Sequence, residues 1–75
     1  MDGIIESAAA VAAEFGPRLR AARIAAGLTQ TDLGREIGLP PSRISEWESG
    51  IGAPKWEYVL RVCAALKIPV SRLAK

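Results

Sequence analysis

The sequence contains no histidine and only one cysteine, Cys63, among its 75 residues. Zinc fingers built from cysteine and histidine, and catalysis by a histidine base, are therefore excluded. A single cysteine cannot form a disulfide within the chain, and the apolar neighbours of Cys63 predict a buried thiol in a reducing compartment. A glycine-rich phosphate loop and clustered carboxylates are missing as well. We therefore expect no metal, no cofactor and no enzymatic activity.

Long apolar runs and strand-like alternation are also missing. No stretch approaches the roughly 20 apolar residues that are needed to cross a membrane, so no membrane partner is expected. A chain of 75 residues makes one domain with one small core. We predict an all-α fold, a compact bundle of four to five short helices, in a cytoplasmic protein.

Positive charge is concentrated after the first 16 residues. Residues 1–16 hold three acids and no base, whereas residues 17–75 hold all ten bases and five acids, a balance of +5. Seven of the bases are arginine, whose guanidinium suits bidentate contacts to phosphate and guanine. This asymmetry predicts a leader over residues 1–16 and a basic domain over residues 17–75, and it favours a nucleic-acid partner.

The leader is rich in alanine and has a strong helix propensity. Its apolar side chains recur at helical spacing: Ile4, Ala8, Val11 and Phe15. We expect a helix over residues 3–15 that packs through Ile4, Val11 and Phe15, with a frayed tail as the alternative. The pair Gly16-Pro17 predicts an interruption before the next helix, because proline fits a first helical turn better than an interior.

Four helices are predicted in the basic domain, over residues 17–26, 30–37, 41–48 and 55–66, with a last turn near residue 71. Thr29 with Asp32 forms the pattern of a capping box, and glycines at positions 27 and 38 suit helix ends. Gly34 lies inside the second of these helices, which indicates a second helix crossing at close range. The first helix is expected to bury Leu19, Ala22 and Ala26. The last helix is expected to bury Trp56, Val59, Leu60, Cys63 and Leu66.

The stretch from Gly38 to Gly50 predicts a short helix with one apolar face. Ile44 and Trp47 lie three apart and share that face, while the other positions are polar or charged. A helix this short is not stable alone, so one side must pack against the rest of the domain. The other side is then exposed and available for binding. A presented polar helix suits the major groove of DNA. A solvated helix in a small bundle is the alternative.

Three motifs in this order resemble the phage repressor and Cro-type (Xre) helix-turn-helix family. They are Arg-Leu-Arg-x-x-Arg-x-x-x-Gly-Leu-Thr-Gln at 18–30, Leu-Gly-x-x-Ile-Gly at 33–38 and Ile-Ser-x-Trp-Glu-x-Gly at 44–50. The resemblance covers about residues 17–73. It implies a DNA-binding fold in which the helix over residues 41–48 is the recognition helix.

The resemblance also implies roles for single residues. Pro41, Ser42 and Glu46 match base-contacting positions, and Gln30 and Arg43 match positions that hold phosphates or base edges. The alternative for Gln30 is a residue that simply favours the start of a helix, and the alternative for Arg43 and Glu46 is solvated surface.

Two further assignments complete the expected site. Arg23 and Glu48 match a structural ion pair, and Lys55 lies where it could clamp a phosphate, with an ordinary surface charge as the alternative. The chain departs from the family pattern at Pro40, where a capping serine or threonine is common, and at Pro41, which has no backbone N–H.

These features predict a sequence-specific, double-stranded-DNA-binding regulator of transcription, with repression the commoner outcome in the family. A homodimer on a palindromic operator is expected, because one small module buries little interface. Such a protein would be associated with the nucleoid when bound to DNA. The alternative is an antitoxin or an interaction adaptor that uses the same fold, with a protein partner bound through the leader.

Overall fold

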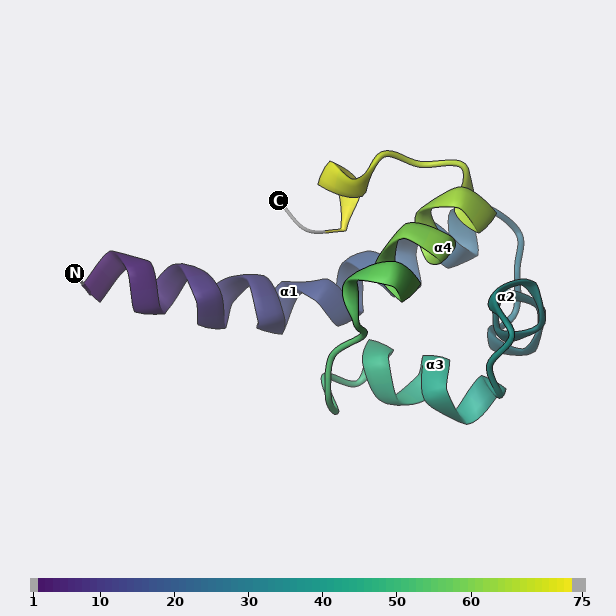
Figure 1. Ribbon diagram of the computed structural model, residues 1–75, viewed down its shortest axis with the longest axis horizontal. Helices are drawn as coiled ribbons and strands as arrows, with labels where there is room; N and C mark the ends of the chain where they lie inside the picture. Colours follow the sequence, from purple (N-terminus) through teal and green to yellow (C-terminus); the bar gives the residue numbers. More distant parts are fainter. Residues whose placement is uncertain (1, 74–75) are drawn as a thin grey trace.

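The computed structural model describes residues 2–73, and the side chains of residues 14–73. Its elements follow in the order α1 (Asp2–Ala25), α2 (Gln30–Ile37), α3 (Pro41–Glu48), α4 (Trp56–Leu66) and the 3₁₀ turn η1 (Val70–Arg72). No strand occurs within residues 2–73, and the helices pack into a bundle with one projecting helix (Figure 1). The expected all-α bundle is confirmed, and α2 and α3 have the predicted bounds.

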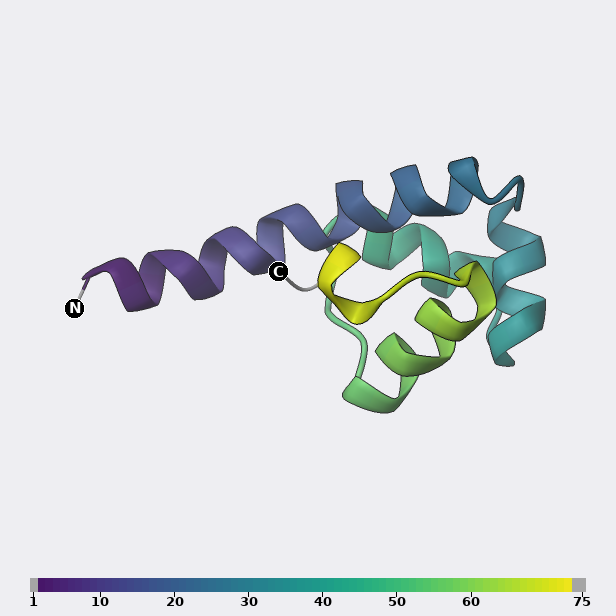
Figure 2. The same ribbon diagram turned by 90° about the horizontal axis from the view of Figure 1, so that it is seen from above.

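The predicted interruption at Gly16-Pro17 is wrong, because α1 runs through both residues as one helix of 24 residues. An interior proline costs about 3 kcal/mol, since it removes one hydrogen bond and crowds the preceding turn. The segment before the pair is rich in alanine and the segment after it is rich in alanine and arginine, and their helix propensity offsets that cost. The N-terminal half of α1 therefore continues the first helix of the bundle and projects beyond it (Figure 2).

The structure describes only part of the packing that is predicted for the leader. The side chains of Ile4 and Val11 lie outside the described ones, whereas Phe15 is half-buried against the core. The division into a leader and a basic domain stays a prediction. Despite the length of α1, none of the helices described combines the length and the apolar character that crossing a membrane requires.

The core lies where α1, α2, α3 and α4 meet. Its buried apolar residues are Leu19, Ala22, Leu33, Ile37, Ile44, Trp47, Val59, Val62, Cys63, Leu66 and Leu73. Leu73 is only 1% exposed, so the segment after η1 closes one side of the core. The thiol of Cys63 is buried as predicted, and its burial raises the pKa of Cys63. This side chain therefore behaves as a small apolar residue.

The inward face of α4 differs from the prediction. Trp56 and Leu60 are 60% and 45% exposed, and Val62 is fully buried instead. The buried positions 59, 62, 63 and 66 follow the spacing of one helix face. Apolar residues cover more of the circumference of α4 than one core can contact, so the pattern did not reveal which edge is buried. Ala26, also expected inward, is exposed because it lies just beyond the end of α1.

The predicted capping box is present at the N-terminus of α2. Thr29 Oγ1 accepts a hydrogen bond from the Asp32 N–H, and Asp32 Oδ2 accepts one from the Thr29 N–H, each at 3.0 Å. The bond from the Thr29 backbone is the main reason that the pKa of Asp32 is lowered.

The turn between α2 and α3 is tight. Gly38 ends α2 with a φ of 80°. A side chain at Gly34 would overlap the Leu39 carbonyl oxygen, so the close neighbour is this turn and not, as expected, another helix.

Candidate nucleic-acid interface

α3 buries one face and presents the other. Ile44 is fully buried and Trp47 is 4% exposed, which fixes the helix against α1 and α2. Its exposed residues are Pro41, Ser42, Arg43 and Glu46, and the C-cap residue Ser49 is exposed as well. Figure 1 shows α3 along one edge of the bundle, with the other helices to one side of it. The positions predicted to meet bases therefore lie together on one accessible face.

The N-terminus of α3 offers few backbone donors. Its N-cap, Pro40, makes no side-chain capping bond, and Pro41 at the first helical position has no N–H. The Arg43 N–H is donated to the Pro40 carbonyl at 3.0 Å. The exposed side of α3 therefore offers side-chain groups rather than N-terminal N–H groups to a ligand.

Arg43 and Glu46 lie next to each other on the presented face. Arg43 Nε is 3.6 Å from Glu46 Oε1, and both side chains are about half exposed. An exposed pair of this kind contributes about 0–1 kcal/mol, so the two side chains can separate to meet a ligand. Sequence reasoning missed this pair, although its spacing of three residues was the available signal.

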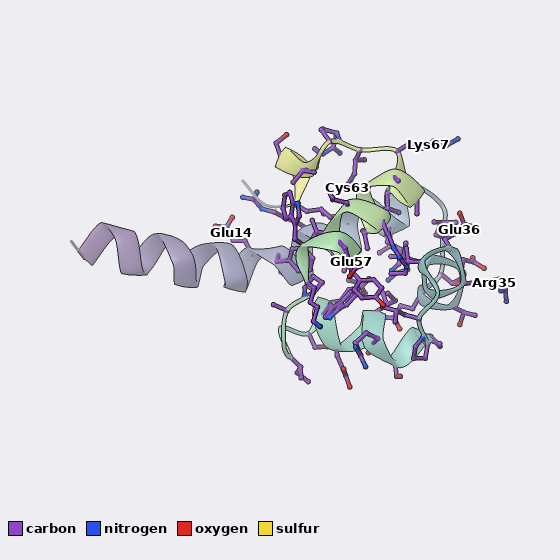
Figure 3. The ribbon with its side chains drawn as sticks, viewed as in Figure 1. Glu14, Arg35, Glu36, Glu57, Cys63 and Lys67 are labelled. Carbon is purple, nitrogen blue, oxygen red and sulfur yellow. The ribbon has the colours of Figure 1, made fainter. Side chains whose placement is uncertain are left out.

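Lys55 and Arg43 line the same cleft, which lies between α3 and the N-terminus of α4 and has a volume of about 370 Å³. Lys55 is the exposed N-cap residue of α4. The remaining lining residues are Trp47, Ala53, Pro54, Glu57 and Tyr58. Figure 3 draws Glu57 at the first turn of α4, above α3. Two cationic side chains in one cleft beside α3 suit a phosphate of the DNA backbone.

Arg23 and Glu48 form a bidentate ion pair between α1 and the end of α3. Arg23 Nε donates to Glu48 Oε2 at 2.6 Å, and Nη2 donates to Oε1 at 3.1 Å. Arg23 Nη1 also donates to the Leu28 carbonyl at 2.8 Å. The side chains are 11% and 5% exposed, and the bond to Glu48 raises the pKa of Arg23. This pair fixes the end of α3 to α1.

Gln30 belongs to the same hydrogen-bond network. Its Nε2 donates to Glu48 Oε1 at 3.1 Å from the first turn of α2. Only the NH₂ end of an amide can face a carboxylate, so the carbonyl oxygen of Gln30 is directed away from Glu48. Sequence reasoning gave Gln30 a DNA contact and missed this bond, because the two residues are 18 positions apart.

Comparisons with known proteins agree with this geometry. A family model described as a helix-turn-helix domain matches residues 14–75. Among solved structures, the chain is similar to the restriction-modification controller protein C.AhdI from Aeromonas hydrophila. The two share 34% identity with a TM-score of 0.79, and the match covers 85% of this chain and 93% of that one. The search of curated proteins found no match. The chain therefore belongs to the Cro/C1-type (Xre-like) helix-turn-helix family of DNA-binding transcription regulators.

Proposed function

We propose that this chain regulates transcription as a homodimer that reads a palindromic operator in double-stranded DNA. The observation that carries the proposal is the presented face of α3, which is polar and accessible, whereas Ile44 and Trp47 on its other side are buried. One module of this size covers one half-site, so two copies are needed on half-sites about 34 Å apart. Repression follows where such a site overlaps a promoter.

The residues beside and on α3 divide into two groups in this proposal. Arg43 and Lys55 hold phosphates of the DNA at the cleft. Gln30 contacts the phosphate backbone of the DNA from the start of α2, where helix N–H groups favour an anion. Pro41, Ser42 and Glu46 face the base edges. Proline supplies an apolar contact, serine a donor or acceptor, and glutamate an acceptor for cytosine N4.

Phosphate contacts make the affinity for DNA depend steeply on salt. We expect the logarithm of the affinity to fall by about 0.9 per neutralised phosphate for each logarithmic unit of salt. Arg43→Ala is expected to weaken binding to all sequences and to reduce this slope by about 1. The control is Arg35→Ala, because Arg35 points outward from α2 on the side away from α3 (Figure 3). Fluorescence anisotropy over a salt series measures the affinity and its salt dependence for both variants. Affinity that is independent of salt, or equal losses in the two variants, would contradict the proposal.

Glu46 is expected to determine which base pair is preferred at one position of each half-site. Because a carboxylate is repelled by phosphate, it contributes favourably only when it faces a donor on a base edge, and a wrong base costs about 1–3 kcal/mol. Glu46→Gln should shift the preference towards adenine at one position in each half-site and leave the others unchanged. Selection of bound sequences from a random library measures this, with Glu57→Gln on α4 as the control. Identical preferences for Glu46→Gln and the parent would assign Glu46 to solvated surface.

A narrower target follows from the similarity to the restriction-modification controller of Aeromonas hydrophila. We propose that the regulated promoter belongs to a restriction-modification gene pair. Sequencing the genomic fragments that the chain retains tests this, since the retained fragments would lie upstream of such genes. The antitoxin or adaptor alternative would be favoured instead if the chain bound DNA only together with a protein partner.

A further inference from the structure

The carboxylate of Glu48 joins α1, α2 and α3. Its Oε2 accepts a hydrogen bond from Arg23 Nε on α1 at 2.6 Å, and its Oε1 accepts bonds from Arg23 Nη2 and from Gln30 Nε2, both at 3.1 Å. The side chain of Glu48 is only 5% exposed, so water competes little for these bonds. The carboxylate therefore ties Gln30, at the start of α2, to the end of α3.

Half of the hydrogen-bonding capacity of the Gln30 amide is left for a ligand. Its NH₂ group has two hydrogens, and one of them is directed at Glu48. Among the residues that the structure describes, the second N–H has no partner, and Gln30 is only half-buried. A phosphate oxygen accepts a bond from an N–H and is repelled by a carbonyl oxygen. Contact with a phosphate therefore requires the amide to be held with its N–H accessible.

We propose that Glu48 is a positioning residue for DNA binding, which holds Gln30 so that the second N–H donates to a phosphate. The proposal rests on the proposed function, which places a phosphate of the DNA at the start of α2. A glutamine side chain that is mobile before binding must be ordered on binding, and this cost lowers its contribution to affinity. Glu48 orders the side chain beforehand. Because phosphate contacts set the position of a protein on the duplex, Glu48 also links that position to α3.

The negative charge of Glu48 does not oppose this role, because Arg23 neutralises it. The bidentate bonds between the two side chains are charge-assisted, and both side chains are nearly buried. Arg23 Nη1 also donates to the carbonyl of Leu28, two residues before α2 begins. The same guanidinium thus holds Glu48, which is the acceptor for Gln30, and the segment that leads into Gln30.

The order of the Gln30 side chain is measurable in the parent chain. Gln30 is the only glutamine and the sequence has no asparagine, so one pair of side-chain amide signals is expected in a heteronuclear NMR spectrum. We expect the order parameter of this NH₂ group to lie near the value of about 0.85 that is typical of rigid backbone. A value below about 0.6, as in flexible groups, would overturn the proposal.

A variant without the carboxylate supplies the second test. Arg23→Met combined with Glu48→Met replaces the pair by apolar side chains, so that no buried charge is left unpaired. The amide of Gln30 then has no acceptor at position 48, and its order parameter should fall below about 0.6. Circular dichroism checks that this double variant is folded. If it does not fold, the order parameter of the parent decides the proposal.

The affinity for DNA separates positioning from mere structural support. We expect Gln30→Ala to lower the affinity of the parent for its selected duplex about tenfold, and that of the double variant by less than about threefold, since a mobile side chain contributes little. The salt dependence should not change, because an uncharged amide displaces no counterion. Arg43→Ala is the matched control. Its ion pair is with Glu46, so it should lower the affinity by the same factor in both backgrounds.

These measurements distinguish failure of this inference from failure of the proposed function. Equal losses for Gln30→Ala in both backgrounds, with Arg43→Ala effective in both, overturn the inference and leave the proposed function standing. A parent chain that selects no duplex refutes the proposed function, and this inference with it.

Discussion

Replacing Glu48 with alanine is expected to lower the free energy of unfolding by about 3–5 kcal/mol, which approaches the whole stability of a domain this small. The carboxylate is only 5% exposed and accepts hydrogen bonds from Arg23 and from Gln30. Without it, the guanidinium of Arg23 stays buried next to no counter-charge, and the amide of Gln30 loses its acceptor. The loss is therefore a penalty for the unpaired groups as well as a lost contact.

Thermal unfolding followed by circular dichroism measures this effect. In a domain of this size each kcal/mol corresponds to about 4–8 °C, so the midpoint should fall by more than about 12 °C. Glu57→Ala is the matched control, because Glu57 also pairs with an arginine but is 65% exposed, and its loss should stay within about 1 kcal/mol. A Glu48→Ala midpoint within a degree or two of the parent would mean that the Arg23–Glu48 pair contributes little.

Gly16→Ala is expected to destabilise the fold by about 1–3 kcal/mol or more, although alanine is the better helix former. A methyl group at this position would lie 2.5 Å from the Glu48 carbonyl oxygen and 2.7 Å from that of Trp47. Both neighbours are backbone atoms, which cannot turn aside as a flexible side chain can. The end of α3 must move away from α1, and it takes Glu48 and its bond to Arg23 with it.

The direction of the change makes this a sharp test. Propensity alone predicts that Gly16→Ala stabilises the helix by about 0.5–1 kcal/mol, so the two explanations differ in sign. Arg20→Ala is the control, since Arg20 is exposed on the same helix and its replacement should change stability by no more than about 0.5 kcal/mol. A higher midpoint for Gly16→Ala would show that α3 does not approach the backbone of α1 at this point.

Features that depend on residues close in sequence were predictable from the sequence. The capping box of Thr29 and Asp32, the left-handed Gly38 and the two apolar anchors of α3 all lie where the pattern placed them. Each involves hydrogen bonds or spacings within a few residues, so the neighbours that decide them are visible in the sequence itself. The pair of Arg23 and Glu48 is a long-range contact, and it was expected only because of the resemblance to a family.

What only the tertiary structure decided involves groups that are distant in the chain. Gly16 lies against the backbone carbonyls of Trp47 and Glu48, at the far end of α3. Val62 is buried and Trp56 is not, because the other helices cover only one edge of a broad apolar stripe. The amide of Gln30 faces Glu48, a partner 18 residues away. The sequence by itself determined α2 and α3 with their ends, and its motifs indicated the family. Which faces the helices turn to one another, and hence which residues stay exposed, depended on packing.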